Sequence, residues 1–360
     1  MKIVFVVPSM KTGGGNRVFF EIANKLSENL DVEVIYPNNS LDKNTFEINR
    51  NINLISVGKL AISKFSKLKN LLNVIRYLNK KHKNDIVVVS DPIFSLFSCL
   101  LRMKRLYRFV QADDYRIFDD GAVLGMGILL QFYKKLCLYS YNYKTNFVFN
   151  SHFVYNQYCV DSKRTDVVYN VVHPAINHGV FKPLVKEREH QKQLQICLVA
   201  RKHPSKGLQT FLNVWNVLPF EITQKIANVV LISHDDLSNF DTLGMRIVQP
   251  SSDIDIAQMY CQSDIFISTS WREGFGLPAL EAMACGCACI ISDAGGVNEY
   301  ALPEENCLMF TPKDEEMLKQ QLIRLVTDDN LRDRLTKEAV KKSFLFDWSL
   351  SAKQLIKIVN

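Results

Sequence analysis

The strongest constraint on the fold is a repeated alternation between short apolar segments and helix-like segments. The chain opens with the apolar segment IVFVVP (3–8), which is followed by a glycine turn, a helix-like segment and a second apolar segment, VEVIYP. Apolar segments without polar alternation indicate strands that are buried on both faces, as in a parallel sheet covered by helices. Further segments of this kind are DIVVVS (85–90), RFVQ (108–111) and NFVFNS (146–151). The first half is therefore predicted to be an α/β domain.

The alternation is interrupted over residues 167–193, where Pro, Asn and a charged run are typical of an interdomain linker. A second series of apolar segments then follows at 195–201, 228–233, 245–250, 264–269 and 287–292. A chain of 360 residues, 47% of them hydrophobic, has room for two domains at about 150 residues each. We expect an α/β protein with two Rossmann-like domains, residues 1–173 and 174–345, a ligand cleft at the strand ends, and a closing helix in 346–360.

The positive charge is concentrated in the first half. Residues 1–173 hold 24 Lys and Arg against 14 Asp and Glu, whereas residues 174–360 hold 20 against 23. The segment from Gly58 to Lys83 has no acidic residue, and its apolar residues fall near helical spacing. Two interpretations stay open: a solvated surface helix, or a basic amphipathic helix (59–83) that docks on an anionic membrane surface. Nucleic-acid binding is not expected, because no recognition motif accompanies the charge.

Several other classes are excluded by what the sequence lacks. The opening apolar run is too short to span a membrane and lacks the flanks of a secretory signal, so a cytoplasmic location is expected. The nine cysteines show no CxxC spacing, which argues against a disulfide framework or a zinc site. Cys285, Cys287 and Cys289 alternate at strand spacing and are interpreted as small buried side chains.

A glycine-rich turn, TGGGNR (12–17), lies between the first strand and the first helix. Without Cβ atoms, its backbone amides are open to an anion at the positive end of the helix. It has neither the GxGxxG nor the GxxxxGK[ST] pattern, so nicotinamide and P-loop nucleotide binding are not supported. A simple tight turn and a loop for an anionic ligand remain equal alternatives.

A second loop, in VARKHPSKGLQTF (199–211), places two cations at the carboxyl end of a strand. Arg201 and Lys206 have the charge and position that suit a diphosphate, whereas Lys202 and His203 are expected to face water. A basic loop without any ligand is the alternative.

The most informative stretch is WREGFGLPALEAMACG (271–286). A predicted strand leads into a glycine loop, Pro278 begins a helix and Gly286 ends it. Glu273 lies in the loop and Glu281 lies one turn inside the helix, so both are expected to face the cleft. Carboxylates repel phosphate but accept hydrogen bonds from hydroxyls. The stretch therefore predicts a ligand with hydroxyls at both ends and a diphosphate between them, which describes a nucleotide sugar.

Residues 263–299, SDIFISTSWREGFGLPALEAMACGCACIISDAGGVNE, closely resemble the signature of retaining glycosyltransferases of the large family 4. The segments VARKHPSKG and PAINHGVFKP (174–183) and the glycine turn resemble further parts of the family pattern. The resemblance implies the GT-B fold, in which two Rossmann-like domains face each other across a cleft and a C-terminal helix packs back on the N-terminal domain. It also implies a nucleotide-sugar donor, retention of anomeric configuration and no metal or other cofactor.

The resemblance assigns roles residue by residue. Arg201 and Lys206 would hold the donor diphosphate, Glu273 would contact sugar hydroxyls, and these three would be catalytic. Glu281 would hold the ribose. The remaining donor contacts would come from Gly14, Gly15, Gln249, Pro250, Gly274, Phe275, Gly276 and Leu277.

The acceptor side departs from the family pattern. Where many members have a histidine, this chain reads FVQADDYRIF (109–118). Its Gln111, Asp113 and Asp114, together with Arg17, are candidates for contacts with the acceptor or the donor sugar, and turn-forming acids are the alternative.

We expect transfer to a glycan or lipid-linked acceptor in surface polysaccharide or glycoconjugate biosynthesis, in the cytoplasm or at the inner face of the cell membrane. A nucleotide-sugar epimerase of the same fold and a non-catalytic nucleotide-sugar-binding partner remain alternatives.

Overall fold

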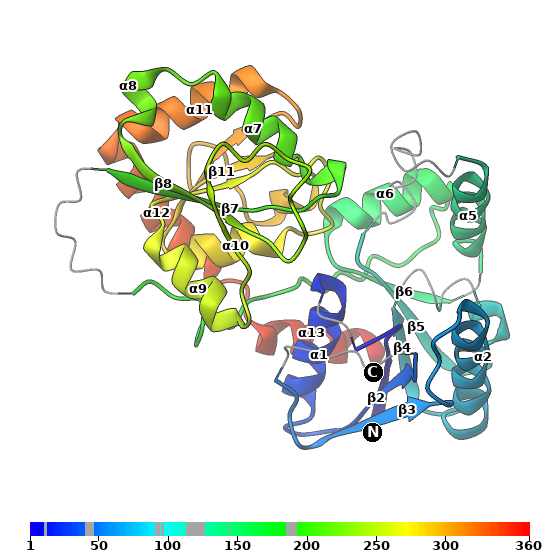
Figure 1. The fold of residues 1–360 in the computed structure, drawn as a ribbon. Helices are drawn as coiled ribbons and strands as arrows, with labels where there is room; N and C mark the ends of the chain where they lie inside the picture. The colour runs from blue at the N-terminus through cyan, green and yellow to red at the C-terminus, as the bar shows by residue number, and fades with distance from the viewer. Residues whose placement is uncertain are drawn as a thin grey trace. The chain divides into compact units, whose positions relative to one another are not determined.

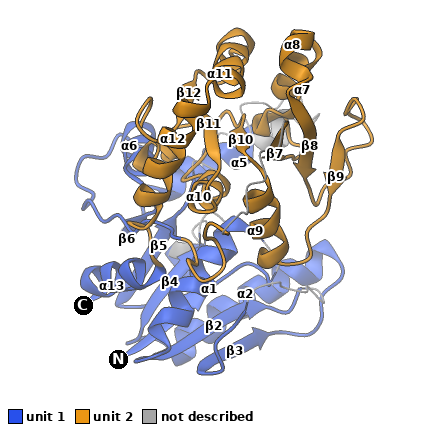
Figure 2. Ribbon diagram, turned by 90° about the vertical axis from the view of Figure 1, so that its left-hand side faces the viewer, with its two compact units in different colours: residues 1–175, 348–360 blue, residues 176–347 orange. Residues whose placement is uncertain are grey.

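The computed structural model divides into two compact units, unit 1 (Met1–Ala175 with Trp348–Asn360) and unit 2 (Ile176–Asp347) (Figures 1 and 2). The boundaries expected from the sequence lie two residues earlier in both places. The structure describes all residues except 11–12, 40–46, 91–93, 95–96, 113–126, 144 and 185–192.

Unit 1 is built on a six-stranded parallel sheet of order β3-β2-β1-β4-β5-β6 (Figure 1). Its strands are β1 (Lys2–Val6), β2 (Asp31–Pro37), β3 (Ile52–Val57), β4 (Ile86–Ser90), β5 (Arg105–Val110) and β6 (Asn146–Phe149). Its helices are α1 (Gly14–Leu26), α2 (Lys64–Lys81), the short η1 (Ser98–Leu100), α5 (Gly127–Ser140), α6 (His152–Ser162) and α13 (Trp348–Val359). The closing helix α13 packs against α1 in this unit.

Unit 2 has a six-stranded parallel sheet of order β12-β11-β10-β7-β8-β9. The strands are β7 (Leu194–Val199), β8 (Ile226–Ile232), β9 (Arg246–Val248), β10 (Ile265–Ser268), β11 (Ala288–Ser292) and β12 (Leu308–Phe310). The helices are η3 (Pro204–Lys206), α7 (Leu208–Asn216), α8 (Phe220–Thr223), α9 (Asp253–Gln262), α10 (Leu277–Ala284), η4 (Gly296–Glu299), α11 (Glu315–Thr327) and α12 (Asp329–Ser343).

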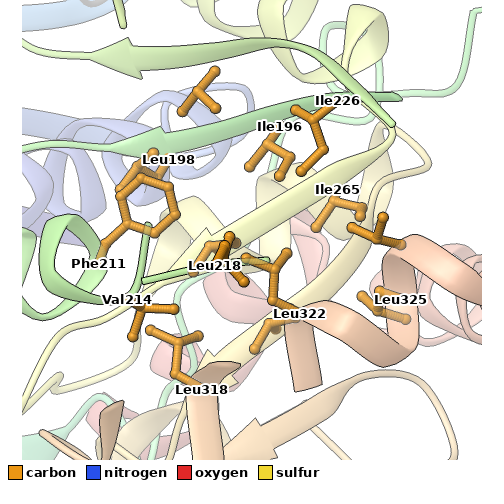
Figure 3. Packing of buried hydrophobic residues seen from close by; sticks show 14 of the residues in the cluster. Ile196, Leu198, Phe211, Val214, Leu218, Ile226, Ile265, Leu318, Leu322 and Leu325 are labelled. Carbon is orange, nitrogen blue, oxygen red and sulfur yellow. The ribbon is translucent and has the colours of Figure 1, made fainter. Parts of the chain in front are cut away.

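An apolar core joins the unit 2 sheet to the helices on one of its faces (Figure 3). Ile196 and Leu198 of β7 and Ile265 of β10 supply the sheet side. Phe211 and Val214 of α7, with Leu318, Leu322 and Leu325 of α11, supply the helix side. These side chains recur at three- and four-residue intervals along the helices, so one stripe of each helix is buried. The packing holds the loops at the strand ends on a rigid support.

The segment expected to be one amphipathic helix from 59 to 83 is only partly helical. Ser63 caps α2, its side chain accepting a hydrogen bond from the amide of Ser66, so the helix begins at Lys64. The apolar residues also do not share one face, because Leu71, Ile75 and Leu78 are buried against the sheet while Leu60, Phe65 and Leu68 are exposed. Among the helices of the described residues, none has both the length and the apolar character that a bilayer span requires.

Candidate functional site

Most of the unit 2 residues assigned from the sequence follow the carboxyl ends of parallel strands in one sheet. Arg201 and Lys206 follow β7, Gln249 and Pro250 follow β9, and Glu273 follows β10. Because parallel strands end at the same edge of a sheet, the loops that carry these residues lie along one edge. This is the edge at which open α/β sheets bind their ligands.

The loop that carries Lys206 is fixed against the end of β10. The Thr269 hydroxyl donates a 3.0 Å hydrogen bond to the carbonyl of Lys206. Gly207 follows with φ +67, and a Cβ there would lie 2.0 Å from the carbonyl oxygen of Thr269, so only glycine allows this approach. His203, which we expected to face water, is half-buried, and its Nδ1 lies 2.7 Å from the Ser205 hydroxyl. The expectation was wrong because the imidazole caps η3.

The loop that carries Glu273 is fixed by its backbone. The amide of Glu273 donates to the carbonyl of Ala294 at 2.8 Å, and its carbonyl accepts from the amide of Gly296 at 2.9 Å. Gly276, with φ +84, is the N-cap of α10, and its carbonyl accepts a 2.6 Å hydrogen bond from the Tyr300 hydroxyl. Burial, and then the charge of Glu273, raises the pKa of Tyr300, so this hydroxyl remains a donor.

The Phe275 side chain anchors the same loop. It is buried, and its ring centroid lies 5.5 Å from that of Tyr300 and 5.6 Å from that of Phe346. Aromatic pairs at these separations stabilise a packed arrangement. Because the side chain faces the core, any contact between Phe275 and a ligand would have to come from its backbone, as the resemblance implies.

The structure brings Lys206 and Glu273 into direct contact. Lys206 Nζ lies 2.6 Å from Glu273 Oε1, and the two side chains are 36% and 20% exposed. A cation suited to phosphate and a carboxylate suited to hydroxyls therefore meet at one point, with solvent access to both.

Arg201 has a different partner, which the sequence interpretation missed. Its Nε lies 3.1 Å from Asp235 Oδ2, and the amide of Lys202 donates to the same oxygen at 2.9 Å. Burial of Asp235 opposes ionisation, but the Lys202 amide and the Arg201 charge together lower its pKa. The carboxylate therefore holds Arg201 in place. The only available sequence signal was an acid in the loop that follows β8, the neighbour of β7 in the sheet.

Glu281 lies in the middle of α10 and is only 4% exposed. Tyr260 lies close to it: burial, and then the Glu281 charge, raises the pKa of this tyrosine. The structure places Glu281 on the helix that begins at the glycine loop, as expected, but in a more enclosed position than a carboxylate facing a cleft. Its contact with a ribose stays a prediction. Gly274 lies in the loop before this helix, and Leu277 is its first residue.

Gln249 and Pro250 line a separate cavity of about 280 Å³ within unit 2. Its other walls include Arg246 and Val248 of β9 and Gln258 of α9. Among the described residues that line this cavity, neither Lys206 nor Glu273 appears. The role of Gln249 and Pro250 beside a base stays a prediction.

The unit 1 candidates gather at the glycine turn. Gly14 and Gly15 begin α1, and the side-chain Nε2 of Gln111 donates a 3.0 Å hydrogen bond to the carbonyl of Gly15. A Cβ at Gly14 would meet no heavy atom within 4 Å, so this turn is open. Arg17 lies half-buried in the first turns of α1. Asp113 and Asp114 lie outside the described residues.

Comparison with known proteins agrees with the fold and the motifs. Residues 184–342, a segment of unit 2, match the family model described as glycosyl transferases group 1. The chain is 25% identical to the N,N'-diacetylbacillosaminyl-diphospho-undecaprenol alpha-1,3-N-acetylgalactosaminyltransferase of Campylobacter jejuni, over 92% of this chain and 91% of that protein.

Solved structures show the fold independently. Sucrose-phosphate synthase from Thermosynechococcus elongatus superposes with a TM-score of 0.82 at 17% identity, covering 99% of this chain and 98% of that one. WaaG, a glycosyltransferase involved in lipopolysaccharide biosynthesis, superposes with a TM-score of 0.77 at 16% identity, covering 99% of both chains. The two-unit α/β fold predicted from the sequence is therefore confirmed as GT-B.

Proposed function

We propose that this protein is a retaining glycosyltransferase that moves a sugar from a nucleoside-diphosphate donor to a hydroxyl of a glycan or lipid-linked acceptor. The observation that carries the proposal is the 2.6 Å contact between Lys206 and Glu273 at the carboxyl edge of the unit 2 sheet. Surface polysaccharide or glycoconjugate biosynthesis is the proposed setting.

The proposed reaction depends on cationic side chains that are in position before the bond between the sugar and the diphosphate breaks. As the bond from the anomeric carbon to the diphosphate opens, negative charge grows on the phosphate oxygens and positive charge grows on the sugar. Lys206 and Arg201 would bind the diphosphate and stabilise it as the leaving group, and no metal is proposed for this role. Loss of one such preorganised donor typically costs about 2.7–4 kcal/mol of the barrier, roughly a hundred- to thousandfold in rate.

Glu273 would bind the sugar of the donor and not its diphosphate. Its carboxylate would accept hydrogen bonds from sugar hydroxyls once the diphosphate has displaced it from Lys206. The backbone from Gly274 to Leu277 would surround the sugar, and Glu281 would accept from the ribose hydroxyls. Retention would follow if the acceptor hydroxyl attacks from the side of the leaving group and gives its proton to the departing phosphate.

The acceptor class rests on the relatives. The Campylobacter enzyme is named for a diphospho-undecaprenol acceptor, and WaaG is described as acting in lipopolysaccharide biosynthesis. A lipid-linked acceptor lies in a membrane, so we propose that the protein works in the cytoplasm at the inner face of the cell membrane. The basic segment 59–83 is the membrane-facing surface expected from the sequence.

A donor screen tests this function. The purified protein is incubated with a panel of nucleotide sugars, and nucleotide release is measured with and without candidate acceptors. We expect one donor to be consumed, faster with acceptor, and the new linkage to be α from an α-linked donor by NMR. A tightly bound donor that no acceptor consumes would support a non-catalytic binding partner instead. An isomerised donor without nucleotide release would support an epimerase.

A further inference from the structure

Helix α5 exposes an apolar stripe that no described segment of the chain covers. Phe132 and Tyr139 are each 63% exposed, and Leu136 between them is 40% exposed. Positions i, i+4 and i+7 lie on one face of a helix, so the three side chains form a row. Cys137 and Ser140 face inward and are buried. Lys135 lies beside the row and is exposed.

Helix α2 has a comparable face. Phe65 is 80% exposed and Leu68 is 47% exposed. At 100° per residue these positions lie on the same side of the helix as Asn79, which lines one cavity with Lys83 and Arg102. The face that begins with apolar side chains therefore continues to a cationic end. In Figure 1 α2 and α5 lie on the same side of the unit 1 sheet, opposite α1 and α13.

The two helices are connected at the surface through η1. The Tyr139 ring packs edge-to-face on Tyr143, with centroids 5.8 Å apart. Burial, and then contact with the Cys99 thiol of η1, raises the pKa of Tyr143. Cys99 and Leu100 in turn line a cavity of about 350 Å³ whose other walls are Ile75, Asn79, Lys83 and Arg102. We call this continuous surface the α2–α5 face.

Among the described residues that contribute to the α2–α5 face, the charged side chains are Lys and Arg. The described segments 58–83, 97–112 and 127–143 contain no Asp or Glu. Lys83 and Arg102 lie at the cavity, and Lys64, Lys67 and Lys69 are exposed at the beginning of α2. A second copy of this face would be repelled by like charge. Lysines around large apolar side chains are instead the arrangement by which peripheral proteins bind anionic lipid, apolar groups entering the bilayer and cations contacting the headgroups.

We propose that the α2–α5 face docks on an anionic phospholipid bilayer, with Phe65, Phe132 and Tyr139 entering the headgroup boundary and Lys83 and Arg102 contacting lipid phosphate. The surface is thus wider than the segment expected from the sequence, because α5 and η1 contribute to it. The inference deepens the proposed function, since it gives the partner that would present a lipid-linked acceptor.

Flotation of the full-length protein with vesicles tests the docking without any activity measurement. Vesicles of phosphatidylcholine alone are compared with vesicles that also contain phosphatidylglycerol. We expect the protein to bind only to the anionic vesicles, and we expect salt to weaken this binding. Two double variants should each weaken it at least about tenfold: Phe132→Ser with Tyr139→Ser, and Lys83→Glu with Arg102→Glu. The matched control is Phe220→Ser, which removes a 75% exposed phenylalanine from α8 of unit 2 and should bind as the wild type does.

A fluorescent probe reports the orientation directly. Trp215, Trp271 and Trp348 all lie outside the α2–α5 face, so Phe132→Trp adds a local signal. We expect the added emission to shift to the blue on anionic vesicles, whereas Phe220→Trp should not shift. Circular dichroism checks that the variants are folded, and nucleotide release from a donor in solution should be unchanged in all of them. Loss of that release alone would count against the proposed function and not against docking.

Four results would overturn the docking proposal. The first is a wild type that does not float with anionic vesicles, and the second is double variants that float as well as the wild type. The third is a dimer in light scattering that Phe132→Ser dissociates, which would make the face a contact between copies. The fourth is displacement from the vesicles by nucleic acid at a phosphate concentration equal to that of the lipid, which would point to a nucleic-acid surface.

Discussion

Lys206 Nζ and Glu273 Oε1 lie 2.6 Å apart, so the two groups proposed to bind opposite parts of the donor form an ion pair with each other. A diphosphate has to replace Glu273 as the partner of Lys206. We therefore predict that Glu273→Gln separates nucleotide binding from turnover. The nucleoside diphosphate should bind as tightly or more tightly, because Lys206 is released. Turnover should fall roughly ten- to hundredfold, the cost of about 1.5–3 kcal/mol for a charged hydrogen bond.

Calorimetry with the nucleoside diphosphate and initial rates with the complete donor measure the two effects. Lys206→Ala is the companion variant and should weaken both. Because the pair is partly exposed, neither change should lower the free energy of unfolding by more than about 1 kcal/mol. If Glu273→Gln weakens nucleotide binding as strongly as Lys206→Ala does, the two side chains do not have the separate roles that we propose.

The contact between Arg201 Nε and Asp235 Oδ2 gives a second prediction. Arg201→Ala should cost roughly a hundred- to thousandfold in turnover, as for loss of a preorganised cation. Asp235→Ala leaves the cation but removes its support, so we expect a smaller loss of about tenfold. Asp235→Asn keeps an acceptor for Arg201 and for the Lys202 amide and should recover most of that loss. Steady-state kinetics of the three variants provide the measurement.

The pH dependence distinguishes this role from a proton-transfer role. The Lys202 amide and the Arg201 charge lower the pKa of Asp235 in spite of burial. A carboxyl whose pKa in the folded protein lies below the ordinary value of about 3.9 is already ionised when the pH exceeds about 3.9. Its charge, and with it its support of Arg201, is lost only at lower pH. The rate should therefore show no titration of Asp235 above about pH 5. A rate profile whose acid limb disappears in Asp235→Asn would mean that Asp235 itself transfers a proton.

The interior strands of the fold followed from the sequence, and so did the edge strands β6 and β9, whereas the edge strands β3 and β12 did not. Strands β1 and β4 are buried on both faces, so their apolar runs were unambiguous. Strand β3 is largely exposed at the end of the unit 1 sheet, and β12 has only three residues at the end of the unit 2 sheet. Edge strands pair on one side and need no continuous apolar pattern. Both were missed for that reason.

In the candidate site, sequence reasoning identified the residue types but not their pairing. The loops of Arg201 and Glu273 were recognised because a strand, a loop and a helix follow one another in the chain. Asp235 was missed because its contact with Arg201 joins two strand ends separated by 34 positions. The burial of Glu281 could not be predicted either, because helical spacing does not show that Tyr260 packs close to it.

Gly276 provides a prediction on stability. Its φ of +84 disfavours any residue with a Cβ, and that Cβ would lie 2.7 Å from Val297 Cγ1 and 2.9 Å from the Tyr300 hydroxyl. Gly276→Ala should therefore lower the free energy of unfolding by more than the roughly 1–2 kcal/mol of a left-handed residue alone. Gly244 has a similar φ of +76 with no heavy atom within 4 Å, so Gly244→Ala measures the conformational part by itself. Urea unfolding of both variants gives the difference between their losses in free energy of unfolding. Equal losses would show that the structure around Gly276 relaxes to accept a Cβ without further cost.

The cysteines give a prediction on chemical reactivity. All nine are free thiols, and Cys99 alone is exposed. Burial raises the pKa of Cys289, and it raises the pKa of Cys307 to about 12. Because the thiolate is the reactive form, a pKa near 12 leaves on the order of one thiolate in ten thousand at pH 8. An Ellman titration at pH 8 should therefore show one fast thiol, with the rest appearing only on unfolding.

Cys99→Ser identifies that thiol, since it should remove the fast phase and leave the total in denaturant lower by one. Cys159 is partly exposed and is expected to react more slowly. Cys99 also lines the cavity of the α2–α5 face, so anionic vesicles should slow its reaction while phosphatidylcholine vesicles leave it unchanged. A fast phase that persists in Cys99→Ser would show that a thiol placed in the core is open to solvent. A different result is also informative: Cys99→Ser removes the fast phase, but anionic vesicles do not slow that phase in the wild type. This result would agree with the burial of the other thiols and would argue against lipid contact at η1.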